Sequence, residues 1–180
     1  MGEAANPCPS TAEKVAFLAS GQGFGVHERP VTVIETHMSW VFLGRTVVFK
    51  MKKPVRFPFL DFSTLERRQR NCEAEVHLNR RLAGDVYQGV IALRCDPAGQ
   101  LTLGPTGEIV EWLVQMRRLP HQEFLDERMR THRLHRNDIV ELAERLARFY
   151  RDAPPAIDDG EAYLRHLRVE SDVNRHVLLS

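Results

Sequence analysis

The sequence lacks the features that mark most secreted, membrane-spanning and zinc-binding proteins. It has only 3 cysteines in 180 residues, and their wide spacing fits neither a zinc site nor a disulfide framework. No apolar run approaches the roughly 18 residues that a membrane helix needs. The first ten residues have neither a basic region nor the apolar core of a signal peptide. These absences predict a cytoplasmic protein with no membrane partner.

An excess of charge of one sign is also missing. The 25 lysine and arginine residues nearly balance the 24 aspartate and glutamate residues, so the net charge is only +1. The arginines between positions 67 and 81 are spread around a helical pattern with no aromatic residues between them, which argues against a nucleic-acid partner. With 43% hydrophobic residues, a chain of this length can bury the core of one domain.

Phosphate-binding loops and metal-site spacings are absent as well. The P-loop pattern GxxxxGK[ST] does not occur, and GQGFG at 21–25 follows a helical pattern at 11–20 instead of a strand. We therefore interpret residues 21–25 as a linker. His132 and His135 are followed by no third ligand of suitable spacing, so we predict no metal site.

What the sequence does contain is a cationic strand followed by one long helix. The stretch VVFKMKK at 47–53 has the β-branched and aromatic residues typical of a strand. Because side chains alternate between the two faces of a strand, Val48, Lys50 and Lys52 share one face. A row of lysines is usually a solvated face, so a functional role for this one depends on what lies opposite it.

The long helix is predicted to begin at Thr64, because Ser63 and Glu66 form a capping box. Its inward face follows the i, i+3, i+4, i+7 spacing and consists of Leu65, Arg68, Cys72, Glu75, Asn79 and Leu82. Glu75 on this face could meet a lysine of the strand across a packed interface. Arg68, on the same face, is an alternative structural partner for Glu75.

The remaining elements complete an α+β pattern. The predicted strands are 31–44, 46–53, 86–96, 100–103 and 108–116, about five in an antiparallel sheet. After Pro120 the pattern becomes helical. A short helix is predicted at 121–130, and a capping box of Asp138 and Glu141 is predicted to open a longer one.

Five stretches of the chain resemble a known bacterial family. They are ETHMSWVFL, VFKMKKPV, FPFLDFSTLERR, CEAEVHLNRRL and VEWLVQMRRLP. Together they are similar to aminoglycoside-phosphotransferase-like proteins, in which a protein-kinase-like domain is commonly joined to a C-terminal P-loop ATPase domain. The resemblance implies an N-terminal tail and short helix (1–30), a kinase-like small lobe (31–119) and the start of a helical large lobe (120–180), which is incomplete.

The resemblance also implies roles for individual residues. Lys50 would contact the α- and β-phosphates of ATP, Glu75 would be its partner on the helix, and Val48 would lie over the adenine. Lys52 is the rival of Lys50, because it shares the same face only about 7 Å further along the strand. We favour Lys50 for the phosphate contact.

Two further parts of the nucleotide site follow from the resemblance. The backbone of Gln115, Met116 and Arg117 would form the hinge that hydrogen-bonds the adenine. The turn between the first two strands would cover the phosphates, although it reads ETHMSW and contains no glycine.

The sequence lacks the catalytic residues of the family that it resembles. A motif like HGDxxxxN, which supplies the catalytic aspartate and a metal-binding asparagine, does not occur; HRND at 135–138 and ESDVNRH at 170–176 have the wrong spacing. His37 and Ser39 could suggest a nucleophilic triad, but a strand hairpin offers no oxyanion hole. We therefore assign no catalytic residue, and we expect the chain to be the front part of a longer protein or a truncated product.

These observations leave two hypotheses. The first is the ATP-binding portion of a kinase-like protein that lacks phosphotransfer activity on its own. It would use magnesium only if the missing lobe were supplied, and that lobe or an ATPase domain would be a partner. The second is a nucleotide-independent protein-interaction module, in which the pair of Lys50 and Glu75 is merely structural.

Overall fold

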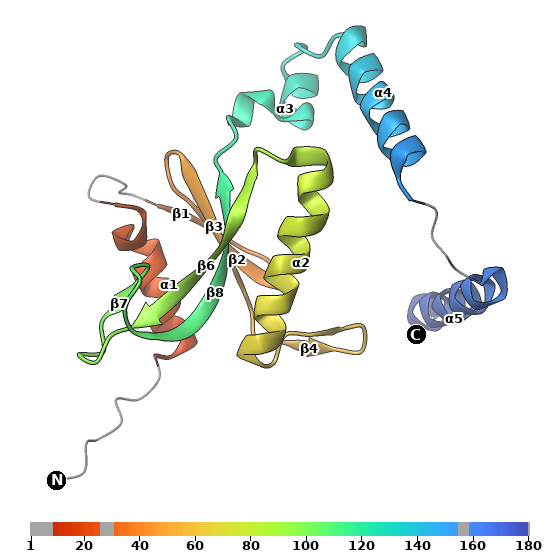
Figure 1. The fold of residues 1–180 in the computed structure, drawn as a ribbon. Helices are drawn as coiled ribbons and strands as arrows, with labels where there is room; N and C mark the ends of the chain where they lie inside the picture. The colour runs from red at the N-terminus through yellow and green to blue at the C-terminus, as the bar shows by residue number, and fades with distance from the viewer. Residues whose placement is uncertain (1–8, 26–30, 155–158, 180) are drawn as a thin grey trace. The chain divides into compact units, whose positions relative to one another are not determined.

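The computed structural model describes residues 9–25, 31–154 and 159–179. The chain divides into two compact units, Met1–Leu134 and His135–Ser180. The first unit is mixed α+β and contains the predicted antiparallel sheet (Figure 1). Its strand order is β1-β2-β3-β8-β6-β7, and all neighbouring pairs are antiparallel.

The sheet has six strands instead of the expected five, because residues 31–44 break into two strands. The six are β1 (Thr32–Glu35), β2 (Ser39–Leu43), β3 (Val47–Lys52), β6 (Tyr87–Cys95), β7 (Leu101–Thr102) and β8 (Glu108–Arg117). Between β3 and the long helix lies a separate small hairpin of β4 (Arg56–Phe57) and β5 (Leu60–Asp61). The break between β1 and β2 falls at residues 36–38, which line a cavity.

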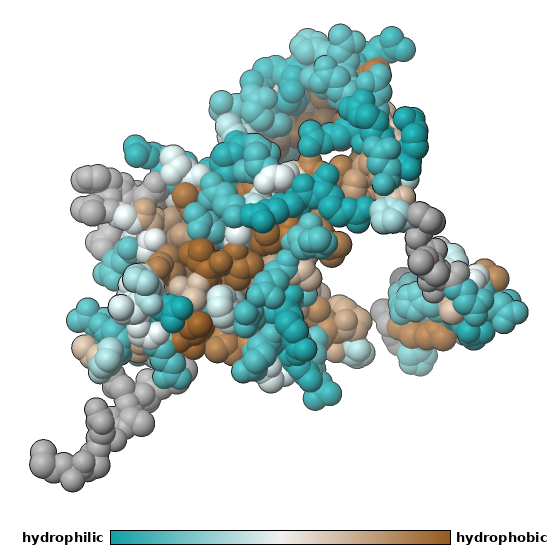
Figure 2. Space-filling model, viewed as in Figure 1, coloured by the Kyte–Doolittle hydropathy of each residue, from teal (hydrophilic) through white to brown (hydrophobic). Residues whose placement is uncertain are grey.

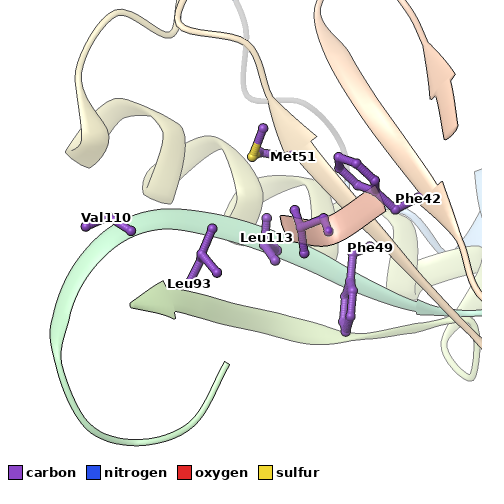
Figure 3. Close-up of a cluster of buried hydrophobic side chains, with 7 residues drawn as sticks. Phe42, Phe49, Met51, Leu93, Val110 and Leu113 are labelled. Carbon is purple, nitrogen blue, oxygen red and sulfur yellow. The ribbon is translucent and has the colours of Figure 1, made fainter. Parts of the chain in front are cut away.

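The core of the first unit occupies both faces of this sheet. On one face, Leu18 of α1 (Thr11–Ala19) joins a buried cluster with Phe42, Phe49, Met51, Leu93, Val110 and Leu113. Figure 3 shows these sheet side chains converging from four strands. On the other face, Cys72 and Val76 of α2 (Leu65–Ala83) pack against Val114. Leu113 and Val114 are consecutive and serve opposite clusters, as strand alternation requires.

The long helix α2 begins one residue later than predicted. Thr64 is its N-cap, and the Thr64 hydroxyl accepts a hydrogen bond from the backbone N–H of Arg67 (3.3 Å). Ser63, the expected cap, instead donates its hydroxyl to Asp61 Oδ1 (2.6 Å). Serine and threonine are both good N-cap residues, so the sequence alone does not distinguish Ser63 from Thr64. Ser63 is bonded to Asp61 of the small hairpin, and Thr64 is therefore the cap.

The 3-10 turn η1 (Gln22–Phe24) occupies the glycine segment that we interpreted as a linker. It is not loose, because Phe24 packs on the core with its ring centroid 4.5 Å from that of Phe49. Gly44 lies against it: a Cβ added at Gly44 would come within 2.5 Å of the Phe24 ring. The segment therefore packs against the core on one face of the sheet.

Helices follow the sheet, as the sequence predicted. They are η2 (His121–Glu123), α3 (Leu125–Arg130), α4 (Arg136–Asp152) and α5 (Gly160–Leu179). The prediction that Asp138 caps α4 is wrong by three positions: the N-cap is His135, the helix begins at Arg136, and Asp138 accepts a hydrogen bond from the backbone N–H of His135 (2.8 Å). Asp138 thus stabilises the first turn from inside the helix.

The second unit exposes apolar side chains on both of its helices (Figure 2). They include Ile139, Leu142 and Leu146 on α4 and Tyr163, Leu164 and Leu167 on α5. Among residues 9–25, 31–154 and 159–179, no helix combines the length and the apolar character needed to cross a bilayer.

Gly107→Ala should destabilise the first unit by about 1–3 kcal/mol. Gly107 has φ = 103°, and an added Cβ would lie 2.5 Å from the carbonyl oxygen of Cys95. The measurement is the urea midpoint of unfolding. Gly89→Ala is the control, because the nearest atom to its added Cβ is 4.0 Å away; equal midpoints for the two variants would contradict the prediction.

Candidate functional site

Strand β3 and helix α2 bring two lysines onto one carboxylate. Lys50 Nζ donates a hydrogen bond to Glu75 Oε1 (2.8 Å), and Lys52 Nζ donates one to Glu75 Oε2. Strand alternation placed both lysines on the face that α2 covers, and the helical spacing placed Glu75 toward them. The structure therefore brings together the three residues that the sequence singled out, and it uses both lysines where we had weighed them as rivals.

The two lysines differ in their exposure to solvent. The side chain of Lys52 is 5% exposed, that of Glu75 is 13% exposed and that of Lys50 is 28% exposed. Lys52 also lies over the Phe62 ring, with Nζ 5.5 Å from the centroid, a favourable cation–π placement. Lys52 is thus an anchor for Glu75, whereas the ammonium of Lys50 remains within reach of a ligand.

Glu75 is held in its charged form. Burial raises the pKa of the Glu75 carboxyl, but the hydrogen bonds and positive charges of Lys50 and Lys52 outweigh it, so the pKa lies below its ordinary value. Two lysines around one carboxylate leave this cluster with a surplus of positive charge. Such a cluster favours an anionic ligand.

The cluster lies in a cavity of about 580 Å³. Its lining residues are Thr36, His37, Met38, Ser39, Val41, Lys50, Lys52, Phe62, Glu75, Tyr87 and Met116. The volume is within the range of small-molecule sites. All of these residues belong to the first unit.

Strand register orders the cavity into three rows. Ser39 pairs with Lys52, and Val41 pairs with Lys50. Tyr87 pairs with Met116 in the third row, which also contains Val48. Neighbouring rows are about 7 Å apart, at two residues per row. The cavity therefore runs from a polar end at Ser39 to an apolar end at Tyr87 and Met116, with Lys50 between them.

Val48, which the resemblance implied to lie over the adenine, pairs with Met116 in the sheet. Its side chain is buried at 6% exposure and is absent from the cavity lining, where Val41 and Met116 are found instead. Val41 lies opposite Lys50 because the hairpin turn is at Arg45 and Thr46, between hydrogen-bonded Gly44 and Val47. The turn that we predicted, at Gly44 and Arg45, would have placed residue 41 opposite residue 48. Tyr87 had no local signal either, since it comes from the distant strand β6.

The segment proposed as the hinge is part of a paired strand. Gln115, Met116 and Arg117 lie inside β8, a central strand whose register pairs it with both β3 and β6. The backbone N–H of Arg117 donates to Val86 O (2.8 Å), and that of Arg118 donates to Thr46 O (2.7 Å). The backbone N–H groups of Arg117 and Arg118 are therefore engaged in the sheet. Only the side chain of Met116 faces the cavity.

The turn between β1 and β2 borders the cavity without any glycine. Thr36 braces it: its backbone N–H and its hydroxyl both donate to Ser39 O (2.9 Å each), and its Oγ1 accepts from the backbone N–H of Ser39 (3.0 Å). At its other side, the Lys53 N–H donates to Met38 O (2.8 Å). The hydrogen bonds of the Thr36 side chain thus fix the conformation of this turn, which has no glycine.

Comparison with known proteins finds relatives of undescribed function. Three curated proteins match: the uncharacterized proteins Rv2004c and MT2060 of two strains of Mycobacterium tuberculosis, and Mb2027c of Mycobacterium bovis. Each is 36% identical over 123 residues, which is 68% of this chain and 23% of the relative. The matched part is therefore about a quarter of the length of these relatives. No family model matches the chain, and no solved structure matches it significantly.

Beside the cavity, the structure contains a buried ionic network that sequence reasoning missed. Glu111 of β8 accepts two hydrogen bonds from Arg68, from Nε to Oε1 (2.7 Å) and from Nη2 to Oε2 (2.9 Å). Lys14 of α1 donates to Val110 O (2.7 Å) and lies 3.5 Å from Glu111 Oε2. Arg68 therefore pairs with Glu111 and not with Glu75, the alternative that helical spacing had left open. The only sequence signal was a lone charge within IVEWLV.

Metal-binding and thiol chemistry have little support in the described part of the chain. It contains no group of three or more His, Cys, Asp or Glu side chains that could hold a metal ion. Burial raises the pKa of the Cys72 thiol to about 12, so this cysteine is protonated and unreactive at neutral pH.

Proposed function

We propose that this chain is the ATP-binding portion of a kinase-like protein of the aminoglycoside-phosphotransferase-like type, and that it binds nucleotide in the cavity between β2, β3 and α2. The observation that carries the proposal is the arrangement of Lys50, Lys52 and Glu75. A strand lysine paired with a helix glutamate beside a cavity is how kinase-like folds position nucleotide phosphates.

The phosphates are assigned to Lys50. Its ammonium is the more exposed of the two, and Glu75 can release it to a phosphate oxygen while still bound to Lys52. Removing Lys52 from Glu75 would instead leave a buried ammonium without its carboxylate, which is strongly unfavourable. The second lysine thus allows the first to exchange its partner.

The base is assigned to the apolar end of the cavity. Met116 and Tyr87 provide a flexible and an aromatic surface there, and Val41 adds a branched one in the neighbouring row, which suits a planar ring. This end lies about 7 Å from the row of Lys50, so base and phosphates can occupy the cavity together. Phosphoryl transfer is not proposed for this polypeptide alone, because the sequence contains no HGDxxxxN-like motif.

ATP should bind this chain, and Lys50→Ala should weaken binding by at least about tenfold, the effect of losing one charge-assisted contact. Isothermal titration calorimetry with the full chain measures it. Lys52→Ala should weaken binding less; the reverse order would overturn the assignment of Lys50. Lys53→Ala is the matched control, because Lys53 pairs with Glu35 and does not line the cavity.

Absence of ATP binding at millimolar concentration would exclude the proposal. It would favour the nucleotide-independent interaction module, in which the same lysine and glutamate residues only hold α2 on the sheet.

A further inference from the structure

The cavity offers a nucleotide positive charge but no carboxylate for a magnesium ion. Among its lining residues Glu75 is the only acidic one, and its two oxygens each accept a hydrogen bond from a lysine. Magnesium is usually held in nucleotide sites by one or two carboxylates together with the phosphates. The magnesium ion that kinase-like folds use therefore does not fit the residues present here.

Glu75 cannot easily change its partner from lysine to metal. Lys52 is 5% exposed, so turning the carboxylate toward a cation would leave a buried ammonium unpaired and would place a second cation beside it. Both effects oppose metal binding. Across residues 9–25, 31–154 and 159–179, no other cluster of three metal-ligating side chains supplies a substitute.

The net charge of the cavity also disfavours a magnesium ion. Two lysines and one carboxylate leave a surplus positive charge in a partly enclosed space, where charges are screened less than in bulk water. Free ATP carries more negative charge than its magnesium complex, because the metal cancels two charges. The lysine that is released from Glu75 therefore gains more from the free nucleotide.

We infer that this chain binds nucleotide in its free, metal-independent form and that magnesium weakens the binding. The inference rests on the proposed function and adds the form of the ligand. It assigns to Lys50, once released from Glu75, part of the neutralisation of phosphate charge that a metal ion provides in kinase-like sites.

The test is a calorimetric titration of the full chain with ATP in two buffers of equal ionic strength, one with EDTA and one with excess magnesium chloride. Binding should be at least about fivefold weaker in magnesium, since the difference arises from ligand charge. Equal or tighter binding in magnesium would overturn the inference and leave the proposed function intact. No binding in either buffer would overturn the proposed function itself.

A variant pair checks the cause. His37 is exposed at the edge of the cavity, so His37→Asp adds a carboxylate there and offsets the surplus charge. The ratio of the two affinities should then move toward one, whereas His37→Asn should keep the ratio of the original chain. The same ratio in both variants would contradict the charge argument. Magnesium chloride alone, titrated into the original chain, should produce no binding signal; saturable binding of the metal would overturn the inference.

Discussion

Glu111→Gln is expected to lower the free energy of unfolding of the first unit by about 3–5 kcal/mol, the range for breaking a buried ion pair from one side. Glu111 is 3% exposed and serves both Arg68 and Lys14, which are also buried. The amide would leave both cations without a negative partner in the interior. A loss of this size is a large fraction of the total stability of an ordinary domain.

The measurement is urea-induced unfolding followed by circular dichroism. Asp85→Asn provides the control, because Asp85 forms an exposed ion pair with Arg117 in the same unit, at 2.5 Å. Exposed pairs contribute little, so its effect should stay within about 0.5 kcal/mol.

A second variant tests the mechanism: replacing Lys14 and Arg68 by Met and Glu111 by Leu should recover much of the lost stability, because apolar residues of similar volume need no partners. A Glu111→Gln midpoint equal to that of the original chain would show that the network is not stabilising.

Glu75→Gln is expected to lower the free energy of unfolding by about 2–4 kcal/mol at neutral pH, because it leaves buried Lys52 without a carboxylate. The effect should be smaller than that of Glu111→Gln, since Lys50 is partly exposed and can turn to solvent. ATP should still bind, because Lys50 no longer has to leave Glu75. A stability loss without a loss of binding would separate the structural role of Glu75 from the role of Lys50.

The effect of Glu75→Gln should depend on pH in a defined direction. The pKa of Glu75 is lowered in the folded state, so its contribution to stability is present above the unfolded value of about 4.3. It is lost as the pH falls through the lower folded value. The difference between the original chain and the variant should therefore be constant near neutral pH and shrink in acid. A difference that grows in acid would contradict the ion-pair explanation.

Glu73→Gln is the matched control on the same helix. Glu73 is exposed and accepts a hydrogen bond from Gln69 Nε2 (3.0 Å). Because this contact lies at the surface, the variant should change the free energy of unfolding by no more than about 0.5 kcal/mol.

The sequence by itself determined the helices and strands, and it determined which side chains face one another where the period of one strand or one helix sets their direction. Strand alternation placed Lys50 and Lys52 on one face, and helical spacing placed Glu75 inward, so their meeting could be predicted from two patterns only 23 and 25 residues apart. The antiparallel sheet and the helices after Pro120 were predicted in the same way. Element ends were less certain, because adjacent polar residues such as Ser63 and Thr64 are equivalent caps until the neighbouring hairpin is in place.

Only the tertiary structure decided what lies next to these elements. Strand β8 lies between β3 and β6, which brings Tyr87 and Met116 to the cavity. The same strand order engages the backbone of Arg117 in the sheet. It also places Glu111 against Arg68, 43 residues away. Strand order is a long-range choice that no residue period encodes. Burial is likewise a property of the assembled layers, so only the structure could show that Lys52 is enclosed as the anchor of Glu75 and that Lys50 remains open to a ligand.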